Sequence, residues 1–322
     1  MNTFGELYSI IEKADVVTIW GHGLPDGDCY GCQIALREAL KDHFPNKKVY
    51  AIGTGIPSLF EFISPMDEVD EETIASSLAV LVDVSCLHRV EDQRVRLAKN
   101  FIKFDHHNPN HLSEPFDHPQ FVDKNRIAVA EILYDFFAEN NMSISRTCAN
   151  ALYAGLMTDS GDFIFYGTTP HTMDVAKKCI ELGADRKMLK KIIYRETPEM
   201  KAFKRYMCEK TKKFGQVAYC WINKEEYESY GLVYEDASSY VNAIANAVPN
   251  NVYAYFCEAP DGEIRVELRS NKGFPVQPVA AHFGGGGHTF AAGLSIIDGK
   301  PTMEEILEQL DHIKGYDIDE VR

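Results

Sequence analysis

The sequence lacks any long apolar run. No stretch approaches the ~20 consecutive apolar residues that a membrane helix requires. The N-terminal segment MNTFGELYSIIEKAD mixes acids with apolar residues, unlike a signal peptide. Low-complexity tracts and internal repeats are absent too, while hydrophobic residues make up 45% of the 322 residues, enough for two domains of ordinary size. We therefore expect a soluble, cytoplasmic, globular protein with no membrane partner.

The cysteines are scattered along the chain. The eight cysteines form no recognisable disulfide framework, and several lie in apolar patterns typical of reduced core thiols. Cys29 and Cys32 have CxxC spacing, but no second pair completes a zinc site. We interpret both as small core residues at the start of a helix.

Basic residues are outnumbered by acidic ones, 33 against 48. Such a balance repels long polyanions, so we expect no binding of long duplex DNA. One segment has a positive net charge, because residues 187–213 hold ten Lys or Arg and three acids. This segment is either the solvated face of a charged helix or a cationic wall that admits phosphates.

From residue 16 to about residue 183, short β-branched runs alternate with helix-like stretches. The runs are VVTIW, KVYAIG, LAVLVDVS and FIKFD, and the helix-like stretches include QIALREALKDHF and AVAEILYDFFAEN. The alternation predicts an α/β fold for residues 1–185, with a parallel sheet and helices on both faces. Ligands of such sheets bind beyond the carboxyl ends of the strands.

The pattern changes after this region. Residues 186–213 favour a basic helical linker, in which Pro198 marks a helix start or a break. Residues 214–322 contain strand-like runs at QVAYCWI, VYAYFCE and EIRVELRS, two helix-like segments and a glycine run at 284–287. They predict a second, smaller α/β domain.

Acidic and imidazole side chains follow three of the predicted strands, and one more aspartate follows a helix-like run. Each alone is commonly a helix cap or a structural side chain. Together they favour a metal centre of manganese, iron, cobalt or zinc, and the lack of thiolates argues against structural zinc. So many carboxylates favour two cations that share a bridging carboxylate and hold a hydroxide for attack on phosphorus. The residues are His22, Asp26, Asp28, Asp83, Asp105, His106, His107 and Asp159.

The ordered set H-x3-D-x-D, D, DHH and D resembles the DHH phosphoesterase superfamily. The downstream ELRS and FGGGGHTFAAG resemble its DHH-associated C-terminal domain, so that the resemblance spans nearly the whole chain. The length and the TDSGDF segment resemble the group of nanoRNases and 3'-phosphoadenosine-5'-phosphate phosphatases. The resemblance implies a hydrolase with two divalent cations, most often Mn²⁺, in a cleft between the domains.

The resemblance also implies a role for each residue of the cluster. One ion would be held by His22, Asp26 and Asp83, and the other by Asp28, Asp83, His106 and Asp159, with Asp83 as the bridge. His107 would donate a hydrogen bond to the scissile phosphate or a proton to the leaving oxygen. Asp105 would orient an imidazole. The implied substrate contacts are Arg269, Ser270, Gly285, Gly286, Gly287 and His288.

Three residues depart from the family pattern: Leu24 replaces a frequent Asn, Cys32 a usual Ser, and Glu267 the first Ser of SLRS. None of them is an implied metal ligand. The favoured hypothesis is hydrolysis of short oligoribonucleotides or dinucleotides such as pApA and pGpG, with 3'-phosphoadenosine 5'-phosphate as a further substrate. The alternatives are an inorganic polyphosphatase or pyrophosphatase and a catalytically silent nucleotide-binding regulator. The sequence leaves the oligomeric state open, and a homodimer is the commonest assembly of soluble proteins.

Overall fold

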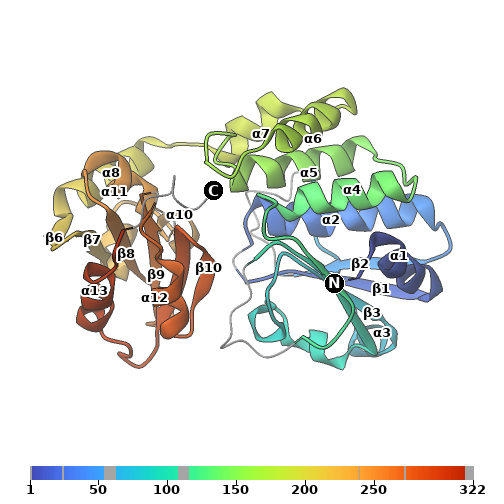
Figure 1. The fold of residues 1–322 in the computed structure, drawn as a ribbon, viewed down its shortest axis with the longest axis horizontal. Coiled ribbons are helices and arrows are strands. Elements are labelled where there is room, and N and C mark those ends of the chain that lie inside the picture. The colour runs from blue at the N-terminus through green and yellow to red at the C-terminus, as the bar shows by residue number, and fades with distance from the viewer. Residues whose placement is uncertain are drawn as a thin grey trace. The chain divides into compact units, whose positions relative to one another are not determined.

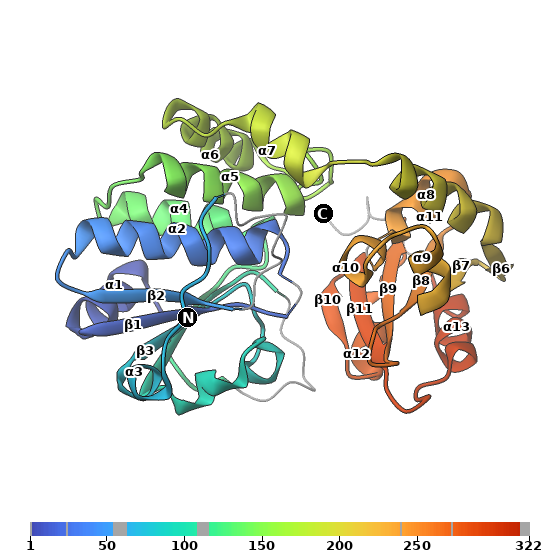
Figure 2. The same cartoon turned by 180° about the vertical axis from the view of Figure 1, so that it is seen from behind.

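The computed structural model describes residues 2–23, 25–53, 63–107, 116–238, 240–271 and 273–315. The chain divides into two compact units, with the change at Arg195 and Glu196. Each unit has its own sheet and its own hydrophobic core (Figures 1 and 2). Within the described ranges, no helix is both long enough and apolar enough to cross a bilayer.

The first unit is built on a five-stranded sheet with the strand order β2-β1-β3-β4-β5. Every neighbouring pair is parallel, which confirms the predicted parallel sheet. The three-residue strand β5 matches none of the predicted runs, because three residues are too few to show a pattern. The strands are β1 Val16–Trp20, β2 Lys48–Ile52, β3 Leu78–Val82, β4 Asn100–Asp105 and β5 Gln120–Val122.

Helices cover both faces of this sheet, as predicted (Figure 1). Side chains alternate between the faces with the period of two that a strand imposes. In β3, Val80 and Val82 join the larger core, whereas Ala79 and Leu81 join a smaller core on the other face. The larger core includes helices α1 Phe4–Lys13, α2 Gly27–His43, α4 Val129–Glu139 and α5 Arg146–Asp159, and the smaller one includes α3 Glu71–Ser76.

Helices α2 and α5 pack against each other at unusually short range. A Cβ atom added to Gly31 would lie 2.3 Å from the carbonyl oxygen of Ala151, and one added to Gly155 would lie 2.6 Å from Asp28 Oδ1. Only glycine leaves room for this approach. The close packing holds the first turn of α2 beside the second half of α5.

The segment 186–213, expected as a linker, contains the change from one unit to the other. Helix α7 Arg186–Ile193 packs on α5, next to α6 Pro170–Glu181. Helix α8 Pro198–Lys210 instead packs on the second unit. Pro198 is the first residue of α8, so it marks a helix start.

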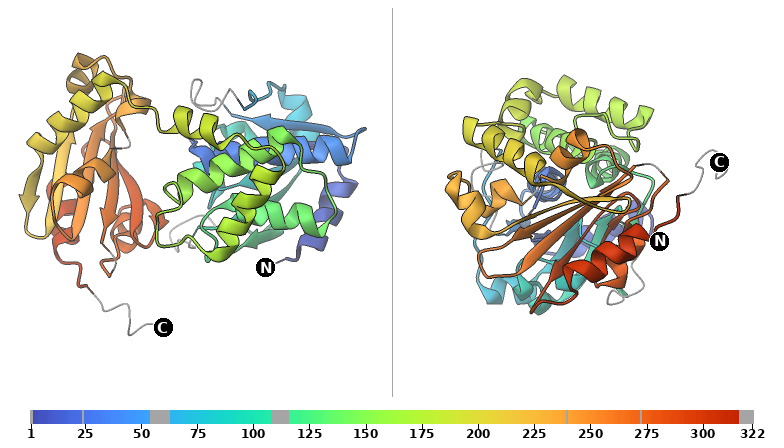
Figure 3. Two further views of the ribbon diagram at one scale, coloured as in Figure 1. Left: turned by 90° about the horizontal axis from the view of Figure 1, so that it is seen from above. Right: turned by 90° about the vertical axis from the view of Figure 1, so that its left-hand side faces the viewer.

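The second unit contains a six-stranded sheet with the order β10-β11-β9-β8-β7-β6 (Figure 3). Strands β7 and β8 are parallel and the other pairs are antiparallel. The three strands predicted for this region are present as β7, β8 and β9. The strands are β6 Lys212–Phe214, β7 Val217–Ile222, β8 Val252–Glu258, β9 Ile264–Ser270, β10 Gly286–His288 and β11 Ala291–Ile296.

Helices also cover this second sheet. Helices α12 Gln277–His282 and α13 Met303–Asp311 contribute to the core of the unit. Helix α11 Val241–Ala247 packs on β7, β8 and β9, and α8 packs on α11. The short helices α9 Lys224–Ser229 and α10 Tyr234–Ala237 lie between β7 and α11 in the chain. A second α/β domain is therefore confirmed.

Candidate metal centre

Three neighbouring strands bring candidate ligands to one edge of the first sheet. His22 follows β1 by two residues, Asp83 follows β3 directly, and Asp105 is the last residue of β4. Strand β3 pairs in parallel with both β1 and β4, so the carboxyl ends of the three strands are neighbours. Asp28 in the first turn of α2 and Asp159 at the end of α5 complete this edge.

Asp83 lies at the centre of the cluster. Its Oδ2 is 3.3 Å from His22 Nε2, and its Oδ1 is 3.2 Å from His106 Nε2 and 3.6 Å from His107 Nδ1. The residue is 2% exposed and its backbone is left-handed, with φ of 53°. This conformation costs roughly 1–3 kcal/mol for a residue other than glycine. We infer that the strained backbone directs the carboxylate among the three imidazoles.

The two imidazoles nearest Asp83 are oriented by backbone carbonyls. His106 Nδ1 lies 3.1 Å from the carbonyl oxygen of Arg126, and His22 Nδ1 lies 3.0 Å from that of Gly23. A carbonyl oxygen only accepts, so Nδ1 of each ring carries a proton and donates it. The Nε2 atoms face the Asp83 carboxylate. His106 Nε2 is also 3.6 Å from Asp159 Oδ2. In the neutral ring Nε2 carries the lone pair that a metal ion needs.

Asp28 is fully buried and is fixed by the start of helix α4. Its Oδ2 accepts the N–H of Val129 at 2.6 Å and its Oδ1 accepts that of Ala130 at 3.0 Å. The thiol of Cys32 donates to the same Oδ1 at 3.3 Å. The N-terminal end of α4 stabilises the negative charge. One ligand atom each from Asp28, Asp83 and His106 lie within 4.8 Å of one another.

Asp26 and Asp105 have additional local roles. Asp26 is the N-cap of α2, where its Oδ1 accepts the N–H groups of Asp28 and Cys29, each at 3.0 Å. Asp105 Oδ1 lies 2.8 Å from His107 Nδ1, and its Oδ2 lies 3.4 Å from Lys103 Nζ. The structure thus places Asp105 where it orients His107.

The carboxylates of the cluster have opposite pKa shifts. Burial raises the pKa of Asp28 to about 7, and the Asp83 carboxylate adds to the shift. Burial also raises the pKa of Asp159 well above its usual range, with contributions from Asp26 and Asp28. Burial acts on Asp83 in the same direction, but the imidazoles of His106 and His22 outweigh it and hold that pKa well below its usual range.

Burial and mutual repulsion therefore oppose the ionisation of Asp28 and Asp159, and added positive charge favours it. Divalent cations supply that charge, and the oxygen and imidazole donors suit them. The residues present therefore fit a metal centre.

Several groups at the site have no signal in the sequence. The N–H groups of Val129 and Ala130 and the carbonyl of Arg126 are backbone atoms, whose contacts do not depend on residue type. Cys29, interpreted as a core residue, also has its Sγ 3.2 Å from the N–H of His22. Burial raises the pKa of its thiol to about 11, so that Cys29 is neutral and buried as expected of a core thiol. Leu24 lies outside the described residues.

In the second unit, the implied substrate residues gather around strand β11. Arg269 of β9 and His288 of β10 both pair with Ala291, from opposite sides. The glycine run enters β10, where a Cβ on Gly285 would lie 2.2 Å from the carbonyl oxygen of Gly293. The hydroxyl of Ser270 donates to the carbonyl of Phe274.

Comparison with known proteins identifies the family. Residues 16–156 match the DHH family, N-terminal domain, and residues 213–314 match the DHHA1 domain. The bifunctional oligoribonuclease and PAP phosphatase NrnA of Bacillus subtilis is 31% identical over 295 residues, which cover 90% of this chain and 92% of that protein. The chain belongs to the DHH family. NrnA of Mycoplasma genitalium is 30% identical over 308 residues, 94% of this chain and 95% of that protein.

A solved structure supports the fold of this DHH protein. The crystal structure of an exopolyphosphatase-related protein from Bacteroides fragilis superposes with a TM-score of 0.79 at 22% identity, covering 95% of this chain and 94% of that chain. Membership of the DHH family makes the protein a metal-dependent hydrolase of phosphate esters. The resemblance inferred from the motifs is confirmed.

Proposed function

We propose that the protein hydrolyses short oligoribonucleotides and dinucleotides of the pApA or pGpG type, and that it also dephosphorylates 3'-phosphoadenosine 5'-phosphate. The observation that carries the proposal is the convergence of Asp28, Asp83 and His106 at one sheet edge. The names of the two relatives, both oligoribonuclease and PAP phosphatase, support the substrate class.

The proposed cofactors are two divalent cations, and Mn²⁺ is the proposed ion because it suits mixed carboxylate and imidazole donors. Such ions, when bound, polarise the phosphate and activate a water molecule. The residues proposed to hold them are His22, Asp26, Asp28, Asp83, His106 and Asp159, with Asp83 between the two.

His107 is the proposed proton donor to the leaving oxygen. Its Nδ1 faces Asp105, which orients the ring, and Nε2 is the atom proposed to donate the proton. Burial raises the pKa of Asp105, but the neighbouring His107 and Lys103 outweigh it and bring that pKa to about 2. Asp105 is therefore ionised at neutral pH, and it favours the His107 ring with a proton on Nδ1.

The second unit is proposed to bind the substrate's phosphates. Arg269 offers a planar fork of donors that fits a phosphate. The backbone of Gly285, Gly286 and Gly287 and the ring of His288 are the proposed partners of Arg269 and Ser270. The interdomain position of the active site, the homodimer and the cytoplasmic location remain predictions.

The test is a panel of pApA, pGpG, a five-nucleotide RNA, 3'-phosphoadenosine 5'-phosphate and pyrophosphate, each assayed with Mn²⁺, Mg²⁺ and Co²⁺. We expect turnover of the dinucleotides to exceed that of pyrophosphate by orders of magnitude. Preferential hydrolysis of pyrophosphate would establish the polyphosphatase alternative instead. Tight dinucleotide binding with no turnover under any metal would establish the regulator.

A further inference from the structure

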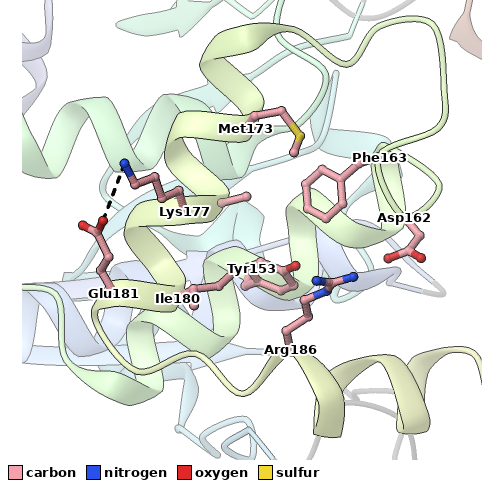
Figure 4. A pocket seen from close by; sticks show the side chains of 9 residues that line it. Tyr153, Asp162, Phe163, Met173, Lys177, Ile180, Glu181 and Arg186 are labelled. Atoms are coloured by element: carbon pink, nitrogen blue, oxygen red, sulfur yellow. Dashed lines mark ion pairs between the residues drawn. The ribbon is translucent and has the colours of Figure 1, made fainter.

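A cavity of about 370 Å³ lies in the first unit, formed by α5, α6, the start of α7 and the turn that follows α5 (Figure 4). None of the proposed metal ligands lines it. The residues that matter here are Tyr153, Asp162, Phe163, Met173, Ile180 and Arg186.

Its walls are mostly apolar. The rings of Phe163 and Tyr153 are packed with their centroids 5.7 Å apart. Met173 and Ile180, on α6, are 51% and 45% exposed, although a side chain of either type is usually buried. A cavity with such walls suits a flat, apolar ring of a ligand.

Three polar groups on the same wall have unused capacity for hydrogen bonds. Tyr153 is 2% exposed, yet its hydroxyl has no hydrogen-bond partner among the described residues. The guanidinium of Arg186 likewise forms no ion pair or hydrogen bond within the described part of the chain. In Figure 4 the two groups point toward each other. Asp162 Oδ1 is buried without a partner, while its Oδ2 pairs with Lys190.

The turn that presents Asp162 and Phe163 is strained. Gly161, Asp162 and Phe163 have consecutive φ values of 58°, 60° and 69°. Two of these are residues with side chains, for which the left-handed region is uncommon. The Oγ of Ser160 accepts the N–H of Phe163 at 2.8 Å and stabilises the turn. Such strain persists where the surroundings fix the conformation, often at ligand sites.

We propose that this cavity is a second ligand site, which binds a small aromatic anion: a planar ring with an N–H donor and one phosphate or carboxylate group. The anion binds Arg186 and the Tyr153 hydroxyl, the ring lies against Phe163 and Met173, and the N–H donates to Asp162. A nucleoside monophosphate and an indole carboxylate share this chemistry. Asp162 lies three residues beyond Asp159 along the chain, and the proposal does not rest on the proposed function.

The experiment follows the methyl signal of Met173 by NMR in the full-length protein, labelled at its methionine methyl groups and kept free of metal by a chelator. Met173→Leu assigns the signal among the nine methionines. The probes are adenosine monophosphate, indole-3-acetate, adenosine and inorganic phosphate. We expect a saturable shift with one or both of the first two, and binding about tenfold weaker or worse with adenosine and phosphate.

Variants locate the binding. Arg186→Ala and Tyr153→Phe are each expected to weaken it about tenfold, whereas Lys187→Ala, an exposed neighbour, and Arg269→Ala in the second unit leave it unchanged. Arg186 is exposed and Phe retains the Tyr153 ring, so both variants should fold. A Met173 signal that no probe moves up to millimolar concentration would overturn the proposal. So would equal affinities in wild type and both variants, or inorganic phosphate binding as tightly as the aromatic anions.

Discussion

At the scale of single residues, Asp83 has the greatest influence on the metal centre. It contacts three imidazoles, is nearly inaccessible to water, and has a backbone conformation unusual for a residue with a side chain. Burial is the largest cause of the raised pKa of Asp28, and the Asp83 carboxylate is the second. Changing its charge therefore changes the balance of the whole cluster.

Asp83→Asn is expected to lower kcat by about 10³-fold or more, the scale of losing one preorganised electrostatic partner in catalysis. Asparagine tolerates positive φ, so the backbone should be retained. Metal analysis should find fewer than the wild-type number of Mn²⁺ ions per chain. Asp15→Asn, at an exposed aspartate, serves as the matched control. Full activity in Asp83→Asn would contradict the proposed mechanism.

The raised pKa values predict how the metal-free protein responds to pH. Asp28 binds protons more tightly in the folded state, with a pKa of about 7, than in the unfolded chain, and the pKa of Asp159 is raised as well. Stability from these groups is therefore fully present below the unfolded carboxyl pKa and is lost as pH rises through the folded pKa. With chelator, the melting temperature should fall between about pH 4 and pH 7.

Added Mn²⁺ should remove this fall in melting temperature, because the cations replace the protons. Asp28→Asn should make the fall smaller in the chelated protein. Thermal unfolding followed by circular dichroism provides the measurement. A melting temperature that rises with pH over this range in the chelated protein would contradict the assignment.

Asp105→Asn tests the orientation of His107. The substitution removes the charge that favours a proton on Nδ1, and we expect kcat to fall about 10- to 100-fold, with a shifted pH profile. Binding of Mn²⁺ should change little, because Asp105 is not a proposed ligand. Loss of metal with unchanged kcat per bound ion would instead identify Asp105 as a ligand.

At the scale of elements, the contact between α2 and α5 places two proposed ligands. Gly155 lies where any side chain would collide with Asp28 Oδ1 at 2.6 Å and approach Ala130 Cβ at 3.0 Å. The cluster thus depends on a helix pair as well as on strand ends.

Gly155→Ala is expected to weaken Mn²⁺ binding and to lower kcat by about 10²-fold, through displacement of Asp28. Replacing a helical glycine by alanine otherwise tends to stabilise a protein. The matched control is Gly5→Ala in α1, where an added Cβ meets nothing within 4 Å. Titration with Mn²⁺ and steady-state kinetics distinguish the two variants, and equal behaviour would refute the steric argument.

The sequence predicted those elements whose composition is distinctive. Strands β1, β3 and β4 are runs long enough to show their pattern, and the polar residues at or just after their ends can be recognised as candidate ligands. The strands β5, β6 and β10 were not predicted, because each has only three residues, and β11 was not predicted because its sequence AAGLSI contains no β-branched run. The contact of Gly155 with Asp28 was also beyond sequence reasoning, since it joins positions far apart in the chain.

At the scale of the whole molecule, charge limits the substrates. The net charge is −15, although residues 187–213 are strongly basic. These basic residues lie on α7, which packs in the first unit, and on α8 and β6 in the second. Long polyanions meet repulsion over most of the surface, whereas a dinucleotide carries little charge to repel.

We expect kcat/KM to fall steadily as the RNA is lengthened from two to about twenty nucleotides, most steeply at low ionic strength. Added salt screens the repulsion and should narrow the difference. Assays with a 5'-labelled RNA ladder at two salt concentrations measure the effect. Faster hydrolysis of the longer RNAs at low salt would contradict it.

All six proposed metal ligands precede Arg195, within the first unit, whereas Arg269 and His288 belong to the second. With the proposed roles, ion binding belongs to the first unit and substrate selection to the second. A lineage would then change its substrate by altering the second unit, while the first unit keeps the same hydrolytic chemistry.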